Sequence, residues 1–223
     1  MIASRAIAWG LLAILAAGTP AIAASPDILW RIVSECVAPD TADYCARCRW
    51  PVDDRCGGRR GCTDTTDVWG ETPEYVAIRD IKMCGCPPGF VHGLALPRVR
   101  VSGVEDPRRP EGLWSFAWEV ARSHIADESE IALVVNPRAA RTQDQLHVHL
   151  VRLAPGARQR MTAGTPGRAP ALDRVWAVAA EQAAGAGLAD YGVLVAKEER
   201  APGFVVFVTG TSPEFAFTAA VCR

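Results

Sequence analysis

The chain has 223 residues, 49% of them hydrophobic, which is enough for one sizeable domain with a substantial core. Its formal net charge is −1, which excludes bulk electrostatic attraction to a polyanion, so we expect no nucleic-acid partner. We expect one domain over residues 25–223.

The N-terminus has the pattern of an export signal. Arg5 precedes an apolar run from Ala6 to Ala17, and the small-residue pattern Ala21-Ile22-Ala23 follows. We expect residues 1–24 to be a signal peptide. An uncleaved anchor is the alternative, although the run is shorter than the roughly 20 apolar residues that span a bilayer. The mature chain is therefore expected outside the cytoplasm, in the periplasm or on the outer face of the inner membrane.

Eight cysteines follow this segment, and they lie at positions 36, 45, 48, 56, 62, 84, 86 and 222. An even number in an exported chain indicates disulfides, here stapling a Cys-rich segment over 36–86, with a connectivity that the sequence leaves open. Cys222 must reach back to that segment or stay unpaired. A zinc site around Cys45-x-x-Cys48 is the alternative, but the spacings match no standard zinc ribbon.

Hydrophobic periodicity predicts helices alternating with hairpins in the first two thirds of the chain. The expected elements are a helix over 26–37, a loop-dominated segment over 38–73, strands over 75–80 and 90–96, a packed helix over 113–125, and strands over 131–136 and 145–153. This order favours an α+β fold with an antiparallel sheet and flanking helices.

The remaining residues, 154–223, are expected to form a C-terminal extension. A Gly/Pro/Arg-rich linker runs to Pro170, and an Ala-rich helix over 172–184 and a hairpin of strands 191–196 and 204–209 follow. This helix and hairpin repeat the earlier order, so we expect them to complete the core as an internal partner of the first part.

Two histidines form the candidate chemical site. Gln145, His147 and His149 alternate with apolar residues, and a period of two places all three side chains on one face of a strand. Imidazole acts as a nucleophile or as an acid and base near neutral pH. A pair of surface histidines on an edge strand is the alternative. His92 and His124, the other two histidines, are expected to be structural.

The segment around these histidines resembles the histidine-triad (HIT) superfamily, whose motif is His-Φ-His-Φ-His-Φ-Φ, with Φ apolar. The middle position falls on His147 and the third on His149, whereas Gln145 departs from the first. Within the superfamily the chain resembles the CDP-diacylglycerol diphosphatase family. The resemblance is carried by Asn136, Arg141-Thr142-Gln143, Tyr75 to Asp80, Leu94 to Pro97, Val101 to Glu105, Pro107 and the aromatic helix around Trp114 to Trp118.

This resemblance implies a HIT-like sheet and hydrolysis of CDP-diacylglycerol, a membrane phospholipid, to CMP and phosphatidate. A nucleotidyl-histidine intermediate would form on His147, assisted by His149 and Gln145. The phosphate would be bound by Asn136, Arg141, Thr142 and Gln143. No metal or cofactor is implied, and the chain would work as a monomer or homodimer. The alternatives are a HIT enzyme acting on soluble nucleotides and a non-catalytic exported binding protein.

Overall fold

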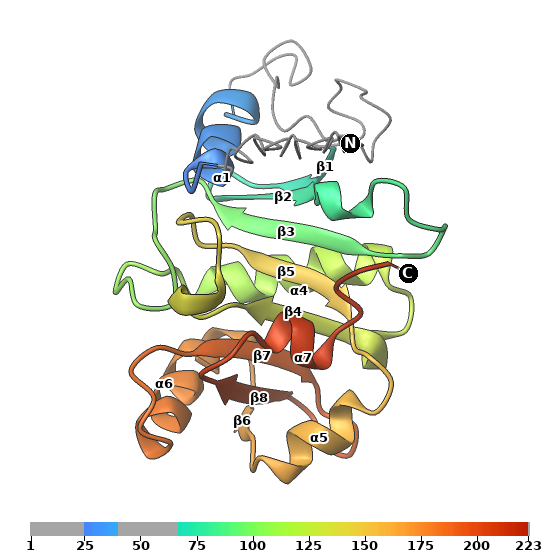
Figure 1. The fold of residues 1–223 in the computed structure, drawn as a ribbon, viewed down its shortest axis with the longest axis vertical. Coiled ribbons are helices and arrows are strands. Elements are labelled where there is room, and N and C mark those ends of the chain that lie inside the picture. Colours follow the sequence, from blue (N-terminus) through green and yellow to red (C-terminus); the bar gives the residue numbers. More distant parts are fainter. Residues whose placement is uncertain (1–24, 40–66, 223) are drawn as a thin grey trace, which may run out of the picture.

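The computed structural model describes residues 25–39 and 67–222 (Figure 1). The predictions for residues 1–24 and for Cys45, Cys48, Cys56 and Cys62 lie outside these residues. The described part is an α+β structure with one eight-stranded antiparallel sheet, in the order β1-β2-β3-β5-β4-β7-β8-β6. Within it, no helix has both the length and the apolar character needed to span a bilayer.

The first hairpin is confirmed. Strands β2 (Tyr75–Arg79) and β3 (His92–Pro97) pair antiparallel. A further strand, β1 (Val68–Glu71), pairs with β2 inside the segment expected to be a loop, so that expectation is wrong there. Gly70 and a register irregularity interrupt the alternation of this strand, which is why periodicity does not reveal it.

The second hairpin is confirmed with a shorter second strand. Strands β4 (Ile131–Val135) and β5 (Val148–Arg152) pair antiparallel. We expected a strand from residue 145, but β5 begins at Val148. The preceding residues bond instead to the connection after β3, where the Leu146 N–H donates to the Val101 carbonyl over 2.6 Å.

The C-terminal helix and hairpin are also confirmed, as α6 (Val175–Gly185), β7 (Gly192–Lys197) and β8 (Phe204–Thr209). Because β7 pairs with β4, these elements extend the same sheet.

The linker expected over 154–170 is wrong, since it contains helix α5 (Ala157–Ala163) and strand β6 (Gly167–Ala169). Residue Gly156, at φ 73°, begins this helix in the left-handed region that glycine tolerates. Ala157 and Met161 bury one helical face. The helix has 7 residues, which is shorter than the window of about 11 residues over which helical periodicity is recognised. A final helix, α7 (Pro213–Phe217), follows the hairpin and was not expected.

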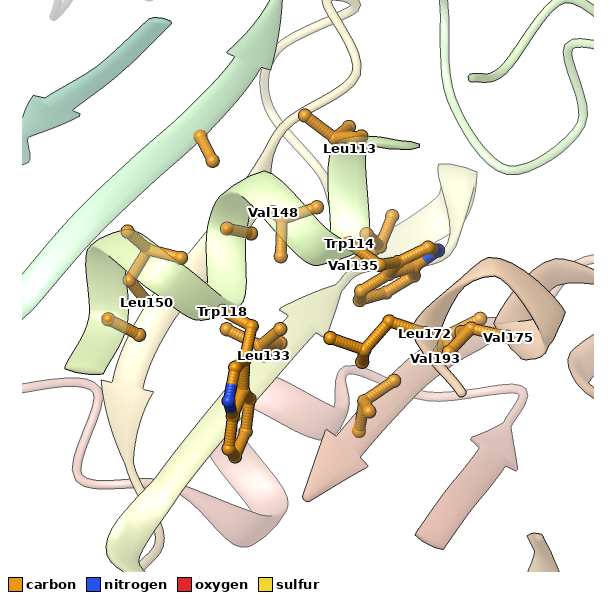
Figure 2. Close-up of a cluster of buried hydrophobic side chains, with 14 of the residues drawn as sticks. Leu113, Trp114, Trp118, Leu133, Val135, Val148, Leu150, Leu172, Val175 and Val193 are labelled. Carbon is orange, nitrogen blue, oxygen red and sulfur yellow. The ribbon is translucent and has the colours of Figure 1, made fainter. Parts of the chain in front are cut away.

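One face of the sheet is covered by α4 (Gly112–His124) and α6, and we call it the α4 face. Figure 2 shows Trp114 and Trp118 of α4 packed among side chains of the central strands and of the segment leading into α6. The expected helix is confirmed, with Leu113, Ala117, Val120 and Ala121 buried, whereas Phe116 is partly buried and His124 is exposed. These apolar contacts form the largest core of the described residues.

The opposite face, which we call the α7 face, carries two smaller apolar clusters. One is formed under α1 (Ile28–Arg31) and the π-helical turn Ile32–Cys36, which together confirm the expected N-terminal helix. The other lies near α5 and α7. Cross-strand partners share a face, and one such row runs Ile78, Leu94, His149, Val134, Leu194 and Phe207. His149 therefore interrupts an otherwise apolar row between the two clusters.

Cys222 reaches back along the chain to Cys86, with which it forms a disulfide. Of the two alternatives for Cys222, pairing with the Cys-rich segment over 36–86 is therefore confirmed. It anchors the segment after α7 beside β3, as Figure 1 shows at the C-terminal end. Short 3-10 turns complete the described fold at Ile81–Met83, Glu128–Glu130, Arg138–Ala140 and Leu172–Arg174.

A histidine cavity on the α7 face of the sheet

A cavity of about 220 Å³ opens on the α7 face, between α1 and the ends of β2, β3 and β5. Its walls differ in character. The apolar side is formed by Ile28, Leu29, Ile32, Ile78 and Leu94, and the polar side by Asp80, Lys82, Thr142, Gln143, His147 and His149, with Arg79 and Ile81 between them. A small apolar site with a few convergent polar groups is typical of a ligand-binding pocket.

His147 lines this cavity, and one of its ring nitrogens is held by the main chain. Its Nδ1 lies 2.7 Å from the carbonyl oxygen of Gln145. A carbonyl can only accept, so Nδ1 carries the proton and Nε2 keeps a lone pair. Among the described residues, Nε2 makes no hydrogen bond. Burial lowers the pKa of His147, so the ring is neutral at physiological pH, the form in which imidazole is a nucleophile.

His149 is joined to a second buried histidine. Its Nδ1 lies 3.0 Å from Nε2 of His92 on the neighbouring strand β3, and Nδ1 of His92 lies 3.1 Å from the carbonyl oxygen of Ala220. The Ala220 carbonyl accepts, so His92 donates from Nδ1 and accepts from His149 at Nε2. Burial lowers the pKa of both rings, that of His149 well below its usual value.

A buried carboxylate lies behind this pair. Glu214, at the start of α7, accepts from Nδ2 of Asn136 over 2.6 Å and from Nζ of Lys82 over 2.6 Å. Ser212 donates to Oδ1 of Asn136, which fixes the orientation of that amide. Burial acts to raise the pKa of Glu214, but the charge of Lys82 and its hydrogen bond to the carboxylate act against burial, and this pKa lies well below its usual range. Glu214 is therefore ionised, with Lys82 as its fixed counter-charge.

The structure brings five of the seven expected site residues together. His147, His149, Thr142 and Gln143 line the cavity, and Nδ2 of Asn136 lies 3.3 Å from Nε2 of His149. Gln143 also binds the N-terminal helix, since its Oε1 accepts from the Leu29 N–H over 3.2 Å.

The other two expected residues do not line the cavity. The amide nitrogen of Gln145 donates to the carbonyls of Pro97 and Val99 over 3.0 and 2.9 Å. Arg141 forms a two-pronged ion pair with Glu105, at 2.9 and 2.5 Å. Both side chains hold the connection between β3 and α4 against the loop that precedes His147.

Sequence reasoning missed four residues of the site: Asp80, Lys82, His92 and Glu214. His92 was expected to be structural, yet it bonds directly to His149. His92, Leu94 and Leu96 are two residues apart along one strand, so their side chains lie on the same face. This spacing is the signal that indicates an inward-facing imidazole. Glu214 gives no such signal before α7 is known. His124 does lie away from the site, stacked on Trp69 with ring centroids 3.9 Å apart.

Metal-ligand donors also meet beside the cavity. Asp80, His92 and His149 each offer one donor atom, and these atoms lie within 4.8 Å of one another. Across residues 25–39 and 67–222 this is the one group of three or more such side chains.

Comparison with known proteins gives consistent results. A family model described as CDP-diacylglycerol pyrophosphatase matches residues 24–187. A CDP-diacylglycerol pyrophosphatase of Yersinia pestis is 28% identical over 181 residues, which are 72% of this chain and 61% of that protein. A probable CDP-diacylglycerol pyrophosphatase of Mycobacterium leprae is 40% identical over 74 residues, 28% of this chain and 27% of that protein. The matched region thus spans less than two thirds of either relative.

Proposed function

Because the chain belongs to the CDP-diacylglycerol pyrophosphatase family, we propose that it hydrolyses CDP-diacylglycerol to CMP and phosphatidate. The observation that carries this proposal is the ring of His147. Its Nδ1 is held by the Gln145 carbonyl, its Nε2 keeps a lone pair, and its side chain lines the cavity.

In the proposed reaction, Nε2 of His147 attacks the phosphorus atom of the CMP moiety. A nitrogen–phosphorus bond forms and the anhydride bond to phosphatidate breaks, so that phosphatidate leaves as a stable phosphate monoester. Water then attacks the same phosphorus and the nitrogen–phosphorus bond breaks. CMP leaves with the water oxygen, the proton of the water passes to solvent, and the lone pair returns to Nε2. Dividing one displacement into two is the usual advantage of a covalent intermediate.

Charge and hydrogen-bond donors near His147 suit a diphosphate. Lys82 lies on the polar wall and offers a cation to the non-bridging oxygens. The hydroxyl of Thr142, on the same wall, adds a donor. Held side chains of this kind stabilise developing charge without reorganising during the reaction.

We further propose that the fold is HIT-like and that the departure at Gln145 is compatible with activity. The group that positions His147 is the main-chain carbonyl of residue 145. Every residue type supplies this carbonyl, so a glutamine in place of the first histidine leaves the positioning contact intact.

The polar wall of the cavity suits the diphosphate of the substrate. We propose that the diphosphate enters the cavity while the acyl chains stay in the membrane. We also propose an exported protein, because a disulfide such as Cys86–Cys222 persists in oxidising compartments.

Trapping the intermediate tests the function. The protein is mixed with CDP-diacylglycerol labelled in its CMP moiety, quenched in alkali and digested. We expect an acid-labile CMP adduct on the peptide that contains His147, no adduct in His147→Ala, and an unchanged adduct in His124→Ala. Steady-state turnover of His147→Ala should fall at least about 10³-fold. Near-full turnover by this variant, with a folded circular dichroism spectrum, would reject the assignment.

Substrate class is tested in parallel. Turnover of CDP-diacylglycerol in detergent micelles is compared with turnover of soluble nucleoside diphosphate esters. Preference for the soluble esters would identify a HIT enzyme of different specificity.

A further inference from the structure

Three buried side chains converge beside the cavity: Asp80 after β2, His92 on β3 and His149 on β5. They are between 0% and 6% exposed. Nε2 of His92 lies 3.4 Å from Oδ2 of Asp80 and 3.0 Å from Nδ1 of His149. We propose that these three residues bind a divalent transition-metal ion of the zinc class. This proposal does not depend on the hydrolase activity.

The spacing of the donor atoms fits such an ion. Zinc binds imidazole nitrogen and carboxylate oxygen at about 2.0–2.2 Å, so two ligand atoms of a tetrahedral site lie about 3.4 Å apart. Asp80 and His92 already have this separation. His92 and His149 need to part by a few tenths of an ångström, and the donor atoms of Asp80 and His149, which lie within 4.8 Å of each other, need to come to the same separation when the ion binds.

In His92 and Asp80, a hydrogen bond to one side-chain atom leaves the other atom available to bind the ion. His92 donates from Nδ1 to the Ala220 carbonyl, which leaves Nε2 as the lone pair. Asp80 accepts the Lys82 N–H at Oδ1 over 2.9 Å, which leaves Oδ2. Hydrogen bonding of the second ring nitrogen to a carbonyl or carboxylate is the usual support of a metal-bound histidine.

His149 can reach the metal-binding tautomer within its present surroundings. Its Nε2 lies 3.4 Å from Oε2 of the ionised Glu214 and 3.3 Å from Nδ2 of Asn136, which donates to the same carboxylate oxygen. A proton on Nε2 is stabilised there, and Nδ1 is then free to bind the ion. The ion thus replaces the proton that His149 and His92 otherwise share.

The local charge also admits a cation. With both imidazoles neutral, the carboxylates of Asp80 and Glu214 balance the charges of Lys82 and Arg79, so the surroundings of the ligands carry no net positive charge. Two nitrogen ligands favour zinc, cobalt or nickel over magnesium and calcium, which prefer oxygen ligands. Three protein ligands leave a fourth position open, and Asp80 and His149 both line the cavity, so this position would face it.

Cobalt binding tests the proposal directly. The full chain, freed of metal with a chelator and kept in non-reducing buffer, is titrated with Co²⁺ and followed by visible absorption. We expect one equivalent to bind with the intense bands of a tetrahedral site and to be displaced by Zn²⁺. Asp80→Asn and His92→Gln should each weaken binding more than about 100-fold, because even residues that only support ligands contribute 10–100-fold. His124→Gln is the matched control and should bind normally.

Failure of the wild-type chain to bind Co²⁺ or Zn²⁺ would overturn the proposal, as would full binding by either ligand variant. A second measurement avoids variants that fail to fold. Crystals of the wild-type chain soaked in Zn²⁺ should give an anomalous peak about 2 Å from Nε2 of His92. A peak only at other residues, or none, contradicts the site. Neither result bears on turnover of CDP-diacylglycerol, which is measured separately.

Discussion

Nδ1 of His147 lies 2.7 Å from the carbonyl oxygen of Gln145, so residue 145 holds the proposed nucleophile through its main chain. The Gln145 side chain has different partners, the carbonyls of Pro97 and Val99. The two parts of this one residue therefore have separable roles, in positioning and in stability.

Gln145→Ala separates these roles. Loss of the amide leaves two carbonyls without their donor, so the free energy of unfolding should fall by about 2 kcal/mol. The contact to His147 remains, so kcat of the folded variant should change less than about tenfold, or under ~1.4 kcal/mol. Urea denaturation and steady-state kinetics measure the two effects. Exposed Gln159→Ala is the control and should change neither. A loss of kcat far beyond tenfold would assign chemistry to the Gln145 side chain.

The buried ion pair of Lys82 and Glu214 predicts a strong coupling energy. Lys82→Met alone leaves the Glu214 carboxylate buried without its cation and should destabilise the fold by about 3 kcal/mol. Lys82→Met combined with Glu214→Gln removes both charges and should recover most of this loss. A double-mutant cycle by urea denaturation gives the coupling.

The control for this cycle is Arg168→Met, which breaks the exposed pair with Glu198 and should cost less than about 1 kcal/mol. If the double variant were no more stable than Lys82→Met, the pair would not be coupled as the structure indicates.

The disulfide predicts a joint effect on stability and activity. It closes a loop of 136 residues, so replacing both Cys86 and Cys222 with serine should lower the free energy of unfolding by about 2–5 kcal/mol. It also releases the segment whose Ala220 carbonyl orients His92, and kcat should fall with it. Thermal unfolding and turnover at a temperature where the variant is folded measure the two effects. Unchanged kcat would show that Ala220 keeps its place without the covalent bond.

We expect ionised Asp106 to stabilise the fold, and we expect this stabilisation to be lost at acidic pH. Its carboxylate accepts from the Arg108 side chain and from the Arg108 and Ser102 N–H groups. The Arg108 hydrogen bond outweighs burial and holds the pKa of Asp106 well below its usual value. Because the pKa of Asp106 is lower in the folded chain than in the unfolded chain, its ionised carboxylate stabilises the fold at pH values above the unfolded pKa of about 3.9. This stabilisation decreases as the pH falls from there toward the folded pKa.

Urea midpoints of the parent and Asp106→Asn, measured from pH 6 to pH 2.5, check this contribution. The parent should be more stable at pH 6, and the difference should shrink as the pH falls below about 4. A difference that stays constant with pH would assign the effect of the substitution to packing.

Local pattern predicted most of the fold. The helices over 113–125 and 172–184 and all three hairpins were predicted because each has enough residues for its period to stand out. Strands β1 and β6 were missed because they are short and contain Gly70 and Gly167. Gly167 lies where a Cβ atom would come within 2.6 Å of Val178, so packing against α6 excludes a side chain at this position.

The site was predicted only where its residues are neighbours in sequence. His147 and His149 stand two residues apart, whereas Asp80, His92 and Glu214 reach them through strand pairing and through the return of the chain after β8. Long-range pairing has no periodicity to detect. The burial that shifts the histidine pKa values likewise depends on the surrounding layers, which no single segment contains.

Residues from Leu29 in the first helix to Ala220 near the disulfide surround the same histidines. A ribosome releases these residues in order, so the strand that carries His147 is made well before Glu214 and Ala220. During synthesis, His149 therefore lacks its neighbour Glu214, and His92 lacks the Ala220 carbonyl. The complete site forms only after the segment that follows α7 has folded back and Cys222 has formed its disulfide with Cys86. The site is therefore assembled later than the strand that carries His147 is synthesised.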